Sequence, residues 1–253
     1  MSWEIKQIPK KLPKLKNPIL IEGLPGIANV GKIAADFLVD ELKGKLLYSF
    51  FSYTMPQTVF VNEKNLVDLP KIELYHIKAK RDILILVGDV QPTEEVPCYE
   101  FSELIIDLLI KLNGKEIITL GGIGLQEEPK DINVYCTGNN KEMITKFKKG
   151  TKIKTDLYGV VGPIMGVSGL LLGLSKNKNI GAIALLAETY AHPMYLGVKS
   201  TKEILKILNK RYSLKIDLSC LDKEIKEIEQ NVKKISDLQL KQQKIEGDIN
   251  YIG

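Results

Sequence analysis

Short apolar runs rich in β-branched residues alternate along the chain with longer segments in which apolar residues recur every three or four positions. The runs are typical of buried strands, and the longer segments are typical of amphipathic helices. The pattern predicts strands in 18–23, 45–54, 71–79, 82–90, 115–124 and 179–189, and helices in 28–42, 99–114, 165–174 and 200–212. Ser200 or Thr201 is the expected N-cap of the last helix, and Asn29 is expected to help cap the first.

The order of these elements predicts the fold class. The run 82–90 is apolar almost throughout, as in strands that are covered on both faces. Strands of this kind alternating with helices predict an α/β fold, with a mainly parallel sheet flanked by helices in three layers. Because ligands bind such sheets at the carboxyl ends of the strands, the glycine-rich segments that follow strands mark the edge to examine.

The last forty residues have a different pattern. A 3-4-3-4-3 spacing separates their apolar residues, which are Leu218, Leu221, Ile225, Ile228, Val232 and Ile235. This heptad stripe predicts a long amphipathic helix that packs on another subunit or back on the core. Gly247 ends it. We therefore divide the chain into an α/β core domain (1–212), an amphipathic helical extension (213–247) and a flexible C-terminal tail (248–253).

Composition narrows the function classes. With 44% hydrophobic and 26% charged residues the chain is of ordinary globular type, and neither a membrane span nor a signal peptide is expected, so we predict a cytoplasmic protein. Three scattered cysteines and two histidines predict no metal site and no cofactor. Of the 36 basic residues only Arg81 and Arg211 are arginines, which disfavours specific nucleic-acid recognition. A non-specific, lysine-mediated RNA-binding module remains a weaker alternative.

The segment after the first buried strand resembles a phosphate-binding loop. Gly26, Gly31 and Lys32 match G-x-x-x-x-G-K-[ST], but Ile33 stands where a magnesium-binding hydroxyl is needed. The mismatch favours a structural role, in which the glycines allow tight turns and close helix–sheet approach. We extend this interpretation to all the glycine loops, namely Gly23, Gly26, Gly31, Gly121, Gly122 and Gly124. The alternative is a nucleotide- or small-anion-binding enzyme, NTPase or ligase-like, that uses the Gly23–Lys32 loop.

Two further segments contain candidate catalytic residues. Ser168 lies in a G-x-S-x-G-like stretch without its last glycine, and His192 lies downstream, so a Ser–His hydrolase is a poor match. The segment 187–197 gathers Glu188, Tyr190, His192 and Tyr195 after a buried strand, and we favour local packing over a substrate surface. No nucleophile, base and orienting group converge in sequence, which favours a binding or assembly role and no catalytic residues.

The blocks PILIEGLPGIANVGKIAADFLVDEL, ILILVGDVQP, IITLGGIG, GPIMGVSGLLLGL and LLAETYAHPMYLGVKSTKEIL occur in this order. Together with a C-terminal YIG they resemble archaeal members of the proteasome assembly chaperone family over residues 15–212, with the long helix and the tail also in place. The resemblance implies a fold similar to that of nucleoside phosphorylases and no catalytic cofactor. It also implies a homo-oligomer that contacts the α subunits of the proteasome core, and it leaves a paralogous partner open.

The resemblance also implies how the contact is made. Family members dock through a C-terminal hydrophobic–tyrosine–any motif, whose carboxylate can pair with a lysine. This chain departs from that pattern, because Tyr251 is third from the end and Asn250 stands where a hydrophobic residue is expected. The partner-binding residues implied are Ile249, Tyr251, Ile252 and Gly253. A single short tail should bind weakly, so the mechanism requires several tails on one oligomer.

Overall fold

The computed structural model describes residues 3–157, 159, 162–223 and 225 of the 253. The chain divides into two compact units, Met1–Ile216 and Asp217–Gly253. Most of the predicted helical extension and all of the predicted tail lie outside the described residues. The predictions for Ile249, Tyr251, Ile252 and Gly253 therefore concern a part of the chain that the structure does not describe. The fold below is that of the first unit.

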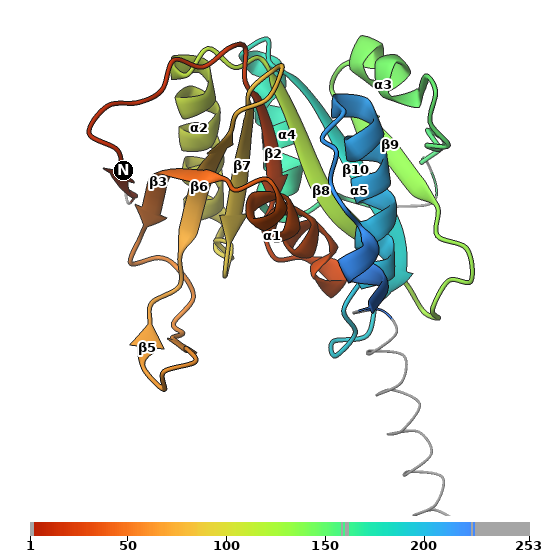
Figure 1. The fold of residues 1–253 in the computed structure, drawn as a ribbon, viewed down its shortest axis with the longest axis horizontal. Helices are drawn as coiled ribbons and strands as arrows, with labels where there is room; N and C mark the ends of the chain where they lie inside the picture. The colour runs from red at the N-terminus through yellow and green to blue at the C-terminus, as the bar shows by residue number, and fades with distance from the viewer. Residues whose placement is uncertain (1–2, 158, 160–161, 224, 226–253) are drawn as a thin grey trace, which may run out of the picture. The chain divides into compact units, whose positions relative to one another are not determined.

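An eight-stranded sheet forms the centre of this unit, in the order β1-β3-β6-β7-β2-β8-β10-β9 (Figure 1). Its strands are β1 (Glu4–Gln7), β2 (Ile19–Gly23), β3 (Lys45–Phe51), β6 (Ile72–Ile77), β7 (Ile83–Gly88), β8 (Glu116–Leu125), β9 (Val134–Gly138) and β10 (Gly181–Tyr190). A separate two-stranded ribbon, β4 (Phe60–Val61) and β5 (Val67–Asp68), extends from the loop between β3 and β6.

The sheet is mixed, with a parallel centre. Strands β7, β2, β8 and β10 pair in parallel, whereas β1, β6 and β9 each run antiparallel to their neighbours. Strand β3 runs in the direction of the central four, so five strands share one direction and three oppose it. The predicted α/β fold with a mainly parallel sheet is confirmed, and its antiparallel strands lie toward the two edges.

Helices cover both faces of the sheet and complete the three layers (Figure 1). Helices α1 (Val30–Glu41) and α5 (Val198–Tyr212) pack together on one face. Helices α2 (Glu95–Lys111) and α4 (Gly166–Asn177) pack together on the other. The short helix α3 (Lys141–Lys148) lies against β9 and β10. Because both faces are covered, every residue of β2 and β7 is buried, as the apolar run 82–90 predicts.

Three expected details are wrong. Helix α5 begins at Val198, so Ser200 and Thr201 lie inside it rather than at its N-cap. Their hydroxyls donate to the carbonyl oxygens of Glu188 (2.7 Å) and Val30 (3.0 Å) and so tie α5 to β10 and α1. Asn29, expected to help cap α1, holds the N-cap position in the left-handed region and makes no side-chain capping bond.

The third detail is the glycine-loop interpretation of Gly121, Gly122 and Gly124, whereas the predicted strand 115–124, which contains them, is confirmed. These glycines lie inside β8, which continues to Leu125. The strand continues because all three pair in parallel register with β10, opposite Leu186, Ala187 and Thr189. The glycines serve close packing all the same: a Cβ built on Gly122 would come 2.8 Å from the carbonyl oxygen of Ile27. The segment after β2 rests directly on the backbone of β8 at this point.

Candidate functional site

The turn between β2 and α1 is built around close backbone contacts. A Cβ on Gly23 would come 2.8 Å from the carbonyl carbon of Gly31, and a Cβ on Gly31 would come 2.9 Å from that of Leu120, closer still to the oxygen in both cases. Real Cβ atoms essentially never approach backbone so closely. Glycine is therefore required at both positions for α1 to sit on the sheet, whereas Gly26 is exposed and a Cβ there would meet nothing.

The residues between these glycines form a strained, well-anchored turn. Ala28 and Asn29 both have left-handed backbone conformations, with φ of 49° and 53°, which costs non-glycine residues free energy. The Ala28 carbonyl oxygen accepts from the Gly197 N–H at 2.8 Å. The Pro25 carbonyl oxygen accepts from the Gln91 side chain at 2.5 Å. The loop is thus fastened to the segments that follow β7 and β10, the neighbouring parts of the same edge.

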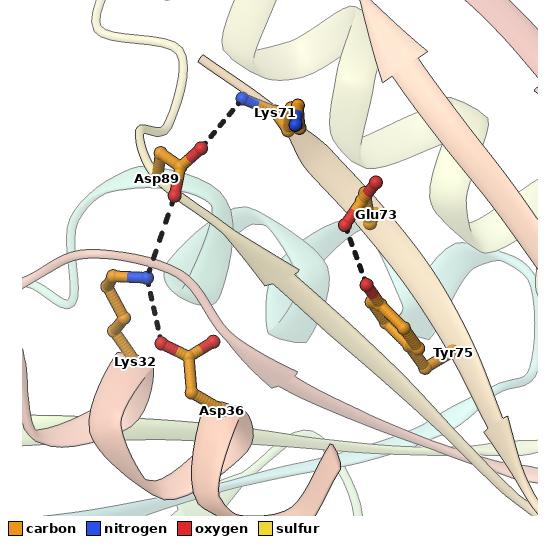
Figure 2. Close-up of polar contacts among 6 residues, drawn as sticks. All are labelled: Lys32, Asp36, Lys71, Glu73, Tyr75 and Asp89. Atoms are coloured by element: carbon orange, nitrogen blue, oxygen red, sulfur yellow. Dashed lines mark hydrogen bonds and ion pairs between the residues drawn. The ribbon is translucent and has the colours of Figure 1, made fainter. Parts of the chain in front are cut away.

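Lys32, the residue that would reach a phosphate, is engaged by carboxylates. Figure 2 shows its amine between Asp36 Oδ2, at 2.8 Å, and Asp89 Oδ1, at 4.0 Å. Asp89 also accepts a hydrogen bond from the Lys71 backbone N–H at 3.0 Å, which fixes it at the end of β7. A bound anion would therefore compete with two carboxylates for this amine, and this arrangement disfavours the phosphate-loop hypothesis.

The same residues line a small depression of about 350 Å³. Its floor includes Glu73, which accepts a hydrogen bond from the Tyr75 hydroxyl at 2.8 Å (Figure 2). Burial, and next the hydrogen bond to Glu73, raise the pKa of Tyr75 above its usual range. Burial also raises the pKa of Asp36, although the hydrogen bond from Lys32 opposes this. The depression is lined by four acids and two amines, an excess of negative charge that suits an ionic surface contact more than a reacting group.

A buried carboxylate beside this turn escaped the sequence analysis. Glu22 is 0% exposed on β2; its Oε1 accepts from the Leu24 N–H at 2.9 Å, and its Oε2 accepts from the Ser168 hydroxyl at 2.8 Å. Burial raises its pKa to about 7, although both hydrogen bonds act in the opposite direction. A single acid inside an apolar strand was the available signal. The pair joins β2 to the start of α4.

The Ser–His hydrolase hypothesis gains no support from the geometry. The Ser168 hydroxyl is committed to Glu22. The His192 ring stacks on Tyr190, with ring centres 5.5 Å apart, and its Nδ1 accepts from the Met194 N–H. Each side chain thus has its own local partners. A triad would need the histidine to accept a proton from the serine, and no such contact joins them among the described residues.

The segment 187–197 packs locally, as favoured. Tyr195 lies edge-on to Tyr190 at 5.6 Å, and its hydroxyl donates to Glu128 at 3.0 Å. Glu188 has other partners and accepts from the Asn133 side chain at 2.7 Å and the Tyr135 hydroxyl at 3.2 Å. The strand end therefore holds two separate polar clusters, and the four side chains do not meet in one pocket.

At the start of α2, Glu94 is the N-cap and Glu95 lies in the first turn, as expected of charges that favour a helix N-terminus.

The described residues contain no group of three or more His, Cys, Asp and Glu side chains placed to hold a metal ion. In the same part of the chain, no helix combines the length and apolar character needed to cross a membrane.

These features define a three-layer α/β protein whose glycines at the carboxyl edge of the sheet set backbone packing. The chain belongs to the PAC2 family, whose family model matches residues 20–236. This membership, together with the solved relatives below, confirms the resemblance to the proteasome assembly chaperone family.

Several relatives are similar over almost their whole length. The chain is 31% identical to Pyrococcus furiosus PbaB, described as an archaeal proteasome activator, with a TM-score of 0.84 over 93% of this chain and 99% of that one. It is 27% identical to P. furiosus PbaA, described as an archaeal homolog of proteasome-assembly chaperone, with a TM-score of 0.76 over 96% of each chain. An uncharacterized Methanocaldococcus jannaschii protein is 31% identical over the full length of both chains.

Proposed function

We propose that this protein is a non-enzymatic proteasome assembly chaperone or adaptor that binds the α subunits of the proteasome core as a homo-oligomer. The observation that carries the proposal is the similarity to PbaB, which extends over nearly all of both chains at 31% identity. The packing role of Gly23 and Gly31 supports it, because the motif that most favoured an enzyme has a structural explanation.

In this proposal the C-terminal tail is the anchor. Tyr251 and Ile252 supply apolar area, and the terminal carboxylate pairs with a lysine of an α subunit. One short tail has to be ordered on binding and so binds weakly. Several tails on one oligomer raise the affinity through their effective concentration, by about 10²-fold or more. Self-association is therefore part of the mechanism.

The proposal is tested by affinity capture of proteasome α subunits from an archaeal extract. The full-length protein is compared with a variant that lacks residues 251–253, with Tyr251→Ala, and with Asn250→Ala as the matched control. We expect the truncation and Tyr251→Ala to lose most of the captured α subunit and Asn250→Ala to retain it. Circular dichroism establishes that all four proteins are folded. Equal capture by the truncated protein contradicts the role of the tail.

The oligomer and the enzyme alternative need separate measurements. Light scattering on the purified protein should give a mass of at least twice the 28.4 kDa of one chain. A monomer would exclude the multivalent mechanism. The alternative enzyme predicts magnesium-dependent binding of ATP or GTP that is lost in Lys32→Ala. We expect nucleotide and magnesium to change the melting temperature of Lys32→Ala no differently from that of the wild type.

A further inference from the structure

A basic pocket lies at the opposite edge of the sheet, where the parallel strands begin (upper edge in Figure 1). It has a volume of about 930 Å³. Four segments that are distant in sequence form most of it: residues 16–17 before β2, residues 77–81 between β6 and β7, residues 115–116 at the start of β8, and residues 211–214 at the end of α5. Leu42, which follows α1, completes the lining. The fold therefore creates the pocket, and no short sequence motif predicts it.

The charge of the pocket is strongly one-sided. Its basic side chains, set against the single acid Glu116, are Lys16, Lys78, Lys80, Arg81, Lys115 and Arg211. Both arginines of the whole sequence are among them. A second pocket of about 580 Å³ shares Lys78 and Leu42 with the first and adds Lys11, Lys43 and Lys45 without any acid.

The single acid of the pocket is already neutralised. Glu116 pairs with Arg81 at 2.7 Å and with Lys146 at 3.7 Å. The Arg81 Nε also donates to the Asn17 carbonyl oxygen at 2.6 Å, so this guanidinium is held rigidly in the wall. Within the part of the chain that the structure describes, Lys78, Lys80 and Lys115 have no carboxylate within ion-pair distance. Their charges remain uncompensated, which costs stability until an anion binds.

The remaining wall suits a ligand with a non-polar part as well as charge. The Arg211 guanidinium lies over the Phe147 ring, 5.2 Å from its centre, which fixes its plane. Leu42 and Tyr212 add apolar surface. Burial, and next the charge of Glu116, raise the pKa of Tyr212, so its hydroxyl keeps its proton and can donate. The volume is within the range of small-molecule sites, about 300–1,000 Å³.

We propose that this pocket binds a small molecule that carries several phosphate groups, with Lys78, Lys80, Lys115 and Arg211 as its principal partners. Arginine and lysine together are the side chains that proteins use for phosphate, the first by its planar fork and the second as a mobile point charge. A long single-stranded nucleic acid fits less well, because such ligands require exposed aromatic side chains for stacking and Tyr212 is the one aromatic residue in this lining. The site is independent of the tail and of the Gly23–Lys32 turn.

The test is isothermal titration of the full-length protein with sodium tripolyphosphate, without magnesium and at constant ionic strength. Arg211→Gln and Lys115→Gln are the site variants. Lys64→Gln, on the exposed ribbon far from this edge in Figure 1, is the matched control for loss of one surface charge. We expect saturable binding by the wild type and the control, and binding about tenfold weaker in each site variant, as loss of one charged hydrogen bond predicts. Inorganic phosphate should bind more weakly than tripolyphosphate to the same site.

Several outcomes would overturn the inference. They are no saturable binding by the wild type, equal weakening by Lys64→Gln, and unchanged binding in both site variants. Tighter, Arg211-dependent binding of a single-stranded RNA or of an acidic peptide would also overturn the proposed ligand class. Because Arg211 also packs on Phe147, unfolding of its variant is checked by circular dichroism. Lys115→Gln removes an exposed charge of the lining, so the test remains decisive if the Arg211 variant unfolds.

Discussion

Replacement of Gly31 by alanine tests whether the glycines of the β2–α1 turn serve packing. The added methyl would come 2.9 Å from the carbonyl carbon of Leu120 and closer to its oxygen, whereas ordinary Cβ contacts begin at 3.4 Å. The neighbour is backbone in the middle of β8, which cannot rotate away as a side chain can. Helix α1 therefore has to lift from the sheet by at least about 0.5 Å, the difference between those distances.

The size of the effect follows from what α1 covers. Its inner face consists of residues that are 0% exposed, namely Val30, Ala34, Ala35 and Leu38. A gap of about 0.5–1 Å forfeits a quarter to a half of the dispersion energy of each contact. Insertion of a methyl group into a packed core typically costs about 1–3 kcal/mol. We take about 3 kcal/mol here because backbone opposes the methyl. The higher helix propensity of alanine stabilises α1 by about 1 kcal/mol relative to glycine. The net loss in the free energy of unfolding is therefore about 2 kcal/mol.

The assay is urea denaturation followed by far-ultraviolet circular dichroism, with a thermal melt of the same samples. For a unit of this size a loss of about 2 kcal/mol corresponds to a melting temperature about 4–8 °C lower. Gly173→Ala is the matched control, since Gly173 lies inside α4, is exposed, and has no atom within 4 Å of the built Cβ. There the helix propensity acts alone, and we expect a gain of about 1 kcal/mol.

The two variants thus carry the same substitution with opposite expected signs. If Gly31→Ala were as stable as the wild type, or were stabilised like Gly173→Ala, the close packing of α1 on β8 would be wrong. A loss of nucleotide binding with unchanged stability would instead favour the phosphate-loop hypothesis.

Three further substitutions test buried polar groups, each by urea denaturation. The free energy of unfolding of Glu22→Gln, relative to that of the wild type, should rise by up to about 3 kcal/mol between pH 4.5 and 8. The reason is that burial raises the pKa of Glu22 to about 7 in the folded protein, so the wild type loses stability over that window. A pH-independent difference contradicts this. Burial alone would raise the pKa of Asp82, but the hydrogen bond from the Lys16 N–H at 2.7 Å, and next the contact with His76 at 3.1 Å, bring the pKa below its usual value. Asp82→Asn should therefore cost about 2 kcal/mol at pH 7 and progressively less as pH falls through that lowered pKa, and an equal cost at pH 3 counts against it. Asn139→Ala should cost about 3 kcal/mol, since Asn139 accepts from the Ala182 N–H and donates to three oxygens, and a loss below 1 kcal/mol would refute that role.

The sequence predicted most of the core because apolar periodicity reflects burial directly. The strand 82–90 and the helix ending at Asn113–Gly114 both have the expected character, since the apolar residues of each segment are the ones that the core buries. The errors fall where tertiary contacts decide. Gly121 to Gly124 have the composition of a loop, and pairing with β10 keeps them in a strand. Ser200 and Thr201 have the composition of a cap, and carbonyl oxygens on other elements bind their hydroxyls instead.

The sites were harder to predict than the fold, since each depends on residues that the sequence keeps far apart. Glu22 and Ser168 are 146 positions apart and meet only because β2 lies beneath the start of α4. Lys32 matched a phosphate-binding motif, but its pairing with Asp89 depends on where β7 ends. The basic pocket combines four separate segments around Arg81 and Arg211, so no window of the sequence contains it. Local patterns identify residue types, whereas topology determines which of them meet.

The two edges of the sheet differ in a way that reverses the usual expectation for α/β proteins. Ligands normally bind at the carboxyl ends of parallel strands, yet here that edge is closed by backbone packing at Gly31 and by carboxylates around Lys32. Within the described part of the chain, the amino ends instead hold cations that pair with no carboxylate, including Lys78 and Lys115. An anion approaching this molecule meets an amine that is already neutralised at one edge and a field of uncompensated positive charge at the other. Any response of the protein to a phosphate compound should therefore follow Arg211 and not Lys32.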